Sequence, residues 1–578
     1  MITNMKFFLL RKLSKMGSSS GGKKKYVNFR SRQRASLSFF IVVMFFGVFG
    51  IIVFTEIFFI DDRSRASGVV VRPGSLSYSH KQEKSTDYEE SEDYISIRVG
   101  AAMMNDDTLG ALLIGGRAPA ALPVIENSAP SSSKVFNEVQ LPPFPENATL
   151  NEGSWQNVNN TKYKFFVFSA YYDERKGQRV VRIIAATKTR GAERVFCRLW
   201  YKAGEFNASA HVSITVPAKV KVVRENWNLK YSAVFVMCPL TNKTIPVAVS
   251  VVARIRDPPA NLLAVINNHN ETSGAVGVGS SGGGAGLSSP YKFGVCVKPL
   301  HFEYNRALQL IEFIELNRLL GVDHFTFYNH TVGNQVDCVL RDYIDRGLVT
   351  VLPWNLDMIS QKDIRTEGLF AALNDCLYRF MYKYTHLLLI DLDEYILPKN
   401  NDTLGQMIDT LNKRVNGRTT ASFSFQNAFF YLQWDDDDSV YEFDDPVTAN
   451  LITMKKTRRK TKLHPQKQRS KYICRPELTV EAGNHFIWEF IPGHGTMNVP
   501  PDTAILHHYR ICEFGGDDCI KTSSTVDRTA YKFKEGLTSG VKSVYDRLSR
   551  KCGLVELNLP TGKVLNKLMQ FLKPSLER

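Results

Sequence analysis

The sequence predicts an α/β protein with a doubly wound, mostly parallel sheet, preceded by a small β-sandwich-like domain, a stem and one transmembrane helix. Three observations support this fold class. Between residues 291 and 391, apolar runs typical of strands alternate with stretches of helical apolar spacing, which is the pattern of βαβ units. Residues 162–258 hold short β-branched and aromatic runs separated by turn residues, as in β-sandwiches. Residues 35–55 contain no charged side chain.

The N-terminus has the pattern of a membrane anchor. Residues 1–34 carry ten lysines and arginines and no acid, so this tail accounts for most of the net charge of +16. At a helix rise of about 1.5 Å per residue, residues 35–55 are long enough to cross a bilayer core of ~30 Å. Acidic residues follow at positions 56, 61 and 62, so the positive-inside rule places the N-terminus in the cytosol. We expect a cytosolic tail at 1–34, a type II signal anchor at 35–60 and a lumenal chain beyond.

Two further features fit a lumenal location. All nine cysteines lie beyond the anchor, and in an oxidising lumen most of them would pair, with at least one left over. The chain has no CxxC pair, so a thiolate zinc site is not expected. The sequence also has seven N-glycosylation sequons, all beyond the anchor, at Asn147, Asn159, Asn207, Asn242, Asn270, Asn329 and Asn401.

Composition divides the middle of the chain into three parts. Residues 61–160 are rich in Ser, Asn, Pro and acidic residues without a sustained period, which predicts a flexible stem. Residues 161–260 form the β-rich domain, and Cys197 and Cys238 lie inside two of its predicted strands, where a disulfide could join them. Residues 261–290 include a Gly/Ser-rich run typical of a linker.

The last large domain is expected at residues 291–548, with residues 549–578 as a C-terminal segment. Helices at 306–321 and 336–347 are predicted to end at Gly321 and Gly347, since glycine favours the position after a helix. A third helix is expected at 367–383. The strands that alternate with these helices are predicted at 292–297, 324–329, 348–354 and 386–391.

Three carboxylates follow the fourth predicted strand. Asp391, Asp393 and Glu394 come at its carboxyl end, where parallel α/β sheets bind ligands. One chemistry for this pattern is a divalent metal that bridges the diphosphate of a nucleotide-sugar. Another is a haloacid-dehalogenase-like phosphatase with Asp391 as nucleophile and Asp393 as acid/base partner. A pair of structural acids after a core strand is the third alternative.

Six stretches of residues 291 to about 545 add a family resemblance. They are FGVCVKPL, LIEFIELNRLLGVDHFTFYNH, ALNDCLYRF, LLLIDLDEYILP, RSKYICRPE and AILHHYR. In this order they resemble glycosyltransferase family 92, the galactosyltransferase-type enzymes of animals and plants. The resemblance implies a GT-A fold, a nucleotide-sugar donor of the UDP-galactose type, a Mn²⁺-type metal and an inverting reaction. Residues 161–260 resemble the N-terminal domain of these enzymes, which in plant members is similar to a carbohydrate-binding module; a packing role is equally expected.

The resemblance also suggests roles for single residues. Asp391 and Asp393 would bind metal and donor, with Asp393 counted as catalytic, and Glu394 would support them. One of His507 and His508 would complete the metal shell, since residues that alternate along a strand point to opposite faces; His508 is favoured. The remaining candidates come from residue chemistry and position. An inverting transfer needs a carboxylate base, for which Glu489 is chosen and the acidic run 435–438 stays an alternative. Asp357, Lys471, Arg475 and Arg510 are the candidate donor-binding residues.

These predictions describe a Golgi membrane glycosyltransferase that transfers galactose from a UDP-sugar to a glycan acceptor. The basic run at 455–471 lacks interleaved aromatic residues, so we expect no nucleic-acid partner. Two alternatives stay open at this point. The chain could be a lumenal phosphatase of the type described above, or a non-catalytic glycan-binding protein that uses the β-rich domain.

Overall fold

The structure is a computed structural model that describes residues 142–145, 150, 153–202, 211–241, 243–269, 290–414, 417–443, 445–512 and 518–559. The predicted tail and signal anchor at 1–60 lie outside these ranges, as does most of the predicted stem. No helix within the described ranges is long and apolar enough to span a membrane.

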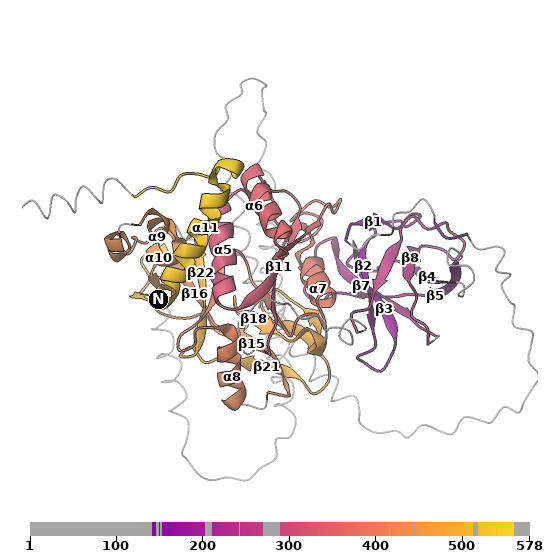
Figure 1. The fold of residues 1–578 in the computed structure, drawn as a ribbon. Helices are drawn as coiled ribbons and strands as arrows, with labels where there is room; N and C mark the ends of the chain where they lie inside the picture. The colour runs from indigo at the N-terminus through magenta and orange to yellow at the C-terminus, as the bar shows by residue number, and fades with distance from the viewer. Residues whose placement is uncertain are drawn as a thin grey trace, which may run out of the picture. The chain divides into compact units, whose positions relative to one another are not determined.

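The β-rich domain contains nine described strands. Eight of them are paired in the order β5-β4-β8-β9-β2-β3-β7-β6, and β1 pairs with β2. Figure 1 shows the domain with most of these strands labelled. Buried side chains of β2, β3 and β7 share one apolar core with those of β4 and β8, so the sheet folds over itself into two layers. The strands are β1 Gln156–Asn157, β2 Phe166–Asp173, β3 Val180–Lys188, β4 Phe196–Lys202, β5 His211–Pro217, β6 Lys219–Val222, β7 Tyr231–Pro239, β8 Ala248–Val252 and β9 Leu263–Ile266.

A disulfide crosses this core. Cys197 on β4 is bonded to Cys238 on β7, and these strands are not neighbours in the sheet. The bond that the sequence suggested is therefore present, and it holds the two layers together. Strand β9 pairs with both β8 and β2, although it lies within the range 261–290 that was predicted to be a linker. The β-rich domain thus extends at least to Ile266.

The second part of the chain is built on a seven-stranded mixed sheet of order β12-β11-β10-β13-β18-β15-β21. The pairs among β10, β11, β12 and β13 are parallel, whereas β18 is antiparallel to β13 and β15. The four strands expected from the βαβ pattern are therefore parallel neighbours, and the later strands make the sheet mixed. The strands are β10 Phe293–Cys296, β11 Val322–Asn329, β12 Val349–Pro353, β13 His386–Leu389, β15 Thr420–Phe425, β18 Lys471–Cys474 and β21 Gly495–Asn498.

A three-stranded sheet adjoins the end of β13. Its order is β14-β22-β16, with β14 antiparallel and β16 parallel to β22. These strands are β14 Glu394–Pro398, β16 Asn427–Tyr431 and β22 Ala504–Arg510. Two small antiparallel pairs complete the described strands, namely β17 Arg458–Lys460 with β23 Ser524–Val526, and β19 Thr479–Ala482 with β20 Ile487–Phe490.

Helices cover both faces of the large sheet. Helices α5, α6 and α11 share one core with the sheet residues Phe293, Val295 and Phe325, whereas α7 shares another with Cys296, Tyr328 and Leu387. Because neighbouring strand residues point to opposite faces, these two sets define a doubly wound arrangement. The helices are α5 Ala307–Leu319, α6 Asn334–Asp345, α7 Leu369–Arg379, α8 Leu404–Arg414, α9 Pro446–Asn450, α10 Ile452–Lys455 and α11 Lys534–Cys552.

The core around α7 also includes the β-rich domain. Phe168 and Phe235 of that domain are fully buried in the same apolar cluster as Tyr378 of α7, and Figure 1 shows α7 between the large sheet and the β-rich strands. The rings of Phe235 and Tyr378 lie 6.0 Å apart in a T-shaped contact. The two domains therefore share a continuous apolar core in addition to their polar contacts.

Three more disulfides lie in the second part. Cys296–Cys376 joins β10 to α7, Cys338–Cys552 joins α6 to α11, and Cys512–Cys519 closes a short loop. Cys474 is buried and free. The odd number of cysteines therefore leaves one unpaired thiol, as expected from the sequence.

A buried histidine at the start of β13 predicts acid sensitivity. His386 lies between the rings of Tyr291 and Phe293, with centroids 5.4 Å away in each case. Burial lowers the pKa of His386 to about 3, and the charge of Arg475 adds to this effect. The unfolded chain therefore takes up a proton below about pH 6.5, while the folded chain does not until about pH 3.

Acidification should lower the unfolding free energy of wild type more than that of the His386→Phe variant. Between pH 7 and pH 5, wild type should lose about 2 kcal/mol more unfolding free energy than the variant, because one proton binds only the unfolded state. Urea unfolding at both pH values measures the difference. An equal loss in the two proteins would mean that His386 is protonated in the folded state.

Candidate active site

The loop after β13 brings together the carboxylates singled out in the sequence. Asp391 and Asp393 lie between β13 and β14, and Glu394 is the first residue of β14. The antiparallel register of β14 and β22 places His508 directly opposite Glu394. Side chains opposite one another on paired strands lie on the same face. The pairing of these two strands is therefore what adds the histidine to the acidic group.

Two lysines contact the first aspartate. The Nζ atoms of Lys471 and Lys298 lie 3.1 Å and 3.4 Å from Oδ2 of Asp391. Lys471 is also 3.5 Å from Glu394 and donates a hydrogen bond to Asn484. The side chain of Lys471 is only 3% exposed, so its charge is stabilised by these acidic partners.

His508 faces the second aspartate. Its Nε2 atom lies 3.3 Å from Oδ2 of Asp393, and its Nδ1 atom lies 3.3 Å from Oε1 of Glu394. The Asn427 side chain on β16 contacts the same Nδ1 atom at 3.0 Å. Contacts at Nδ1 fix the ring orientation. They therefore direct Nε2 towards Asp393, whose side chain is 33% exposed.

The charges of this cluster are coupled. Burial alone would raise the pKa of Asp391, but Lys298 and Lys471 outweigh burial and hold that pKa below its ordinary value. In the same way His508 holds down the pKa of Asp393. Burial raises the pKa of Glu394, and the charges of Asp391 and Asp393 add to the rise. The two aspartates are thus the carboxylates that stay ionised most readily.

The donor atoms allow a test of whether a metal fits. Within the described ranges, no group of three or more His, Cys, Asp and Glu side chains is arranged to hold a metal ion. Asp393 and His508, however, present a carboxylate oxygen and an imidazole nitrogen 3.3 Å apart, and both are ligand types for Mn²⁺. Two protein ligands suffice where substrate phosphates supply the others. Asp391 is less suited to bind a metal ion, because two lysines contact its Oδ2 atom.

A cavity of about 290 Å³ opens beside Asp393. Three cations line it, Arg306, Lys455 and Arg510, against two acids, Asp393 and Glu312, so its net charge is positive. The guanidinium of Arg510 lies 5.1 Å from the centre of the Phe429 ring, and the same ring contacts His508. The structure therefore places Arg510 next to the carboxylate–histidine group.

His507 lies on the other face of β22. It is fully buried and stacks on Phe430 at a centroid distance of 4.5 Å. Its Nδ1 contacts the hydroxyl of Tyr509 at 3.4 Å. Burial lowers the pKa of His507 to about 4. The structure thus brings His508, and not its neighbour, to the acidic cluster.

Lys471 and Arg475 are separated by the length of β18. Lys471 begins this strand and contacts Asp391, whereas Arg475 follows its last residue. Because β18 runs antiparallel to β13, Arg475 lies at the amino end of β13, where it lines a cavity with Tyr291 and His386. The structure therefore does not bring Arg475 to the candidate active site.

Glu489 and Asp357 also have other partners. Glu489 accepts from Lys176, Lys221 and Arg224, all in the β-rich domain. Asp357 pairs with Lys164 of that domain at 2.9 Å and its side chain is 81% exposed. Both residues thus contact the β-rich domain, and neither has a described contact with Asp391 or Asp393.

Two residues at the site were not predicted from the sequence. Lys298 follows β10 directly, at the same edge of the sheet as Asp391, so the carboxyl-end rule could have found it. Asn427 is the first residue of β16. No local signal in the sequence reveals that this strand pairs with β22, so its contact with His508 is visible only in the structure.

Comparison with known proteins identifies the second part of the chain. Residues 291–553 match the sequence profile of glycosyltransferase family 92. The chain is 24% identical to the β-1,4-galactosyltransferase galt-1 of Caenorhabditis elegans over 225 residues, which are 38% of this chain and 48% of that protein. It is 36% identical to the galactan β-1,4-galactosyltransferase GALS1 of Arabidopsis thaliana over 87 residues, 15% of this chain and 17% of that protein.

The chain thus spans about half the length of galt-1 and a smaller share of GALS1. Among solved structures, a mannosyltransferase from Pyrobaculum calidifontis in complex with GDP-Man and Mn²⁺ is 12% identical, with a TM-score of 0.23; the match covers 49% of this chain and 81% of that one. A similarity of this size carries no argument about fold or activity. The resemblance predicted from the six sequence stretches is confirmed by the profile match: residues 291–553 are a glycosyltransferase family 92 domain.

Proposed function

We propose that this protein is a glycosyltransferase that transfers galactose from UDP-galactose to a hydroxyl group of a glycan, with inversion and with help from a divalent metal such as Mn²⁺. The family 92 domain and the two galactosyltransferase relatives support the reaction class and the sugar. The single observation that carries the proposal is the pairing of Asp393 with His508 beside a cationic cavity.

Each residue of the cluster has a role in this proposal. Asp393 and His508 would hold the metal, which when bound would act as a Lewis acid on the donor diphosphate. Glu394 and Asn427 orient the imidazole of His508. Lys298 and Lys471 keep Asp391 ionised, and their positive charges would stabilise negative charge that develops on the leaving nucleotide.

The catalytic base suggested from the sequence is not part of this proposal. Burial would raise the pKa of Glu489, but the hydrogen bonds from Lys176 and Lys221 outweigh it and lower the pKa to about 2. A carboxylate with so low a pKa is a weak base near neutral pH. We therefore assign Glu489 to the contact between the domains and leave the base unassigned.

The proposed location follows from the sequence. The apolar run within residues 35–60 after a basic tail supports a single-pass type II protein of the Golgi membrane with the catalytic domain in the lumen. The four disulfides of the described part suit an oxidising compartment.

The proposal is tested with the full chain and a panel of UDP- and GDP-sugars. We expect nucleotide release from UDP-galactose in the presence of Mn²⁺ and none with EDTA. Turnover of a different sugar nucleotide would correct the donor. Binding of glycans without turnover of any donor would favour the glycan-binding alternative, and phosphate release without a nucleotide-sugar would favour the phosphatase.

A further inference from the structure

A cavity of about 370 Å³ lies where the β-rich domain meets the β19–β20 pair. Small-ligand pockets typically measure about 300–1,000 Å³, so this cavity is large enough for a sugar unit. Its walls come from β3, β6 and β7 on one side and from Val480 and Glu489 on the other. Neither Asp391, Asp393 nor His508 lines it.

Positive charge dominates the lining. The cations are Lys176, Arg182, Lys219, Lys221 and Arg224, and the acids are Asp173 and Glu489. Asp173 is already paired with Arg182 at 3.1 Å and with Arg175 at 2.9 Å. Two acids balance the other four cations: Glu489 in the lining, and the buried Glu481, which pairs with Lys221 at 2.8 Å.

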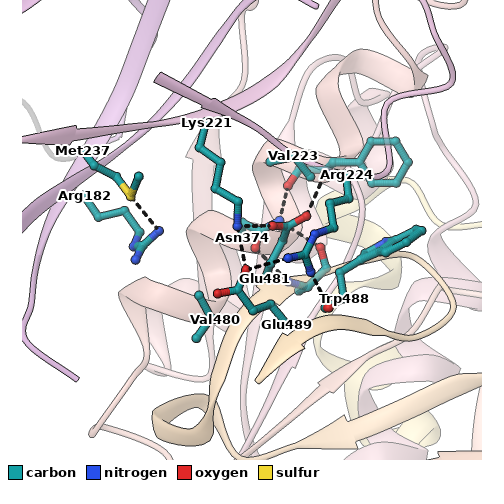
Figure 2. A network of polar contacts seen from close by, with 12 residues as sticks. Arg182, Lys221, Val223, Arg224, Met237, Asn374, Val480, Glu481, Trp488 and Glu489 are labelled. Carbon is teal, nitrogen blue, oxygen red and sulfur yellow. Dashed lines mark hydrogen bonds and ion pairs between the residues drawn. The ribbon is translucent and has the colours of Figure 1, made fainter. Parts of the chain in front are cut away.

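The carboxylate of Glu489 forms ion pairs with three of these cations. Its carboxylate oxygens lie 2.5 Å from Lys176, 2.7 Å from Lys221 and 3.1 Å from Arg224. Figure 2 shows Lys221 and Arg224 reaching from the β-rich domain towards Glu489 and the fully buried Glu481. Lys219 is exposed, and its side chain has no hydrogen bond or ion pair with another described residue, although its backbone belongs to the β6–β7 pair. The cavity thus keeps an excess of positive charge.

Part of the lining is apolar. Val180, Met237 and Val480 contribute hydrocarbon and sulfur surface, and Gln178 adds an amide. A sugar ring has an apolar face and a polar edge, so a mixed lining suits it better than a bare inorganic anion. Lysine and arginine form charge-assisted hydrogen bonds to carboxylate and sulfate groups.

We propose that this cavity binds an anionic saccharide, with the carboxylate or sulfate group of one sugar unit beside Lys219, Lys221 and Arg224. The ring of that sugar packs on Val180, Met237 and Val480. Glu489 competes with the ligand for the same cations and therefore sets the affinity. Binding at this cavity needs no donor nucleotide, so it can be measured whether or not the chain transfers galactose.

The ligand class is tested by calorimetry on the full chain with trigalacturonate, its methyl ester and inorganic sulfate at one fixed salt concentration. We expect the acid to bind at least about tenfold more tightly than the neutral ester, because the ester loses its charge-assisted hydrogen bonds. Equal binding of acid and ester would overturn the proposal. Sulfate binding as tight as that of trigalacturonate would also overturn it, since the site would then recognise a free anion.

Two variants assign the binding to this cavity. Lys219→Gln should weaken trigalacturonate binding about fivefold, the effect of one partly exposed charge, while Lys202→Gln, an exposed lysine on β4 of the same domain, should leave it unchanged. Glu489→Gln should tighten binding about fivefold, because it removes the competing charge. A fold defect cannot produce tighter binding. Equal effects of Lys219→Gln and Lys202→Gln, or weaker binding by Glu489→Gln, would contradict the assignment.

Discussion

Asp393→Asn is expected to lower the rate of the proposed galactose transfer about a thousandfold, equivalent to a loss of about 4 kcal/mol of transition-state stabilisation. The amide keeps the shape of the side chain but loses the negative charge that faces His508 at 3.3 Å. Metal-dependent transfer needs an ionised oxygen at this position. The measurement is kcat/KM for UDP-galactose at saturating Mn²⁺.

The matched control is Asp345→Asn. Asp345 is the exposed last residue of α6, and the same change there should alter kcat/KM less than twofold. Thermal unfolding of both variants should stay close to that of wild type, because the Asp393 side chain is one-third exposed and asparagine has the same shape. Full activity of Asp393→Asn would show that this residue takes no part in the reaction. The main support for a metal-dependent transferase would then be lost.

Asp375→Ala is expected to destabilise the protein by about 3–5 kcal/mol, the range found when a buried ion pair loses one partner. The carboxylate of Asp375 is fully buried on α7. It accepts hydrogen bonds from Ser169 and Tyr171 at 2.5 Å and from Tyr328 at 2.8 Å. It also pairs with Arg379 at 3.0 Å. Alanine would leave all four donors without this acceptor.

Helix α6 offers a control with the same sequence spacing. Asp337 and Arg341 form an i,i+4 pair at 2.8 Å, with side chains 42% and 73% exposed. Exposed pairs contribute little, so Asp337→Ala should change the unfolding free energy by less than about 0.5 kcal/mol. Chemical denaturation of both variants measures the contrast. Similar small changes would mean that water enters the site and replaces Asp375.

The alternation of strands and helices after residue 291 was predictable because each element carries its own apolar period. The loop position of Asp391 and Asp393 followed from the rule that ligands bind at the carboxyl ends of parallel strands. Strand alternation predicted that only one of His507 and His508 would reach the acidic cluster, and His508 was favoured because it precedes the Tyr-Arg pair of the family motif. These three inferences need only local sequence.

The pairings across domains were not predictable. Glu489 accepts from Lys176, which is 313 residues away in the sequence, and no periodicity relates the two positions. Arg475 and Lys471 are close in the sequence, yet they lie at opposite ends of strand β18. Such placements depend on which strands pair, and one sequence does not contain that information.

The apolar core around α7 has a practical consequence for protein production. A fragment cut at the family boundary, residue 291, would expose the surface of α7 that Phe168 and Phe235 cover. Exposed apolar surface of this kind leads to aggregation. We therefore expect the smallest soluble fragment that contains the family 92 domain to begin before Gly153, because that domain needs the β-rich domain to cover α7.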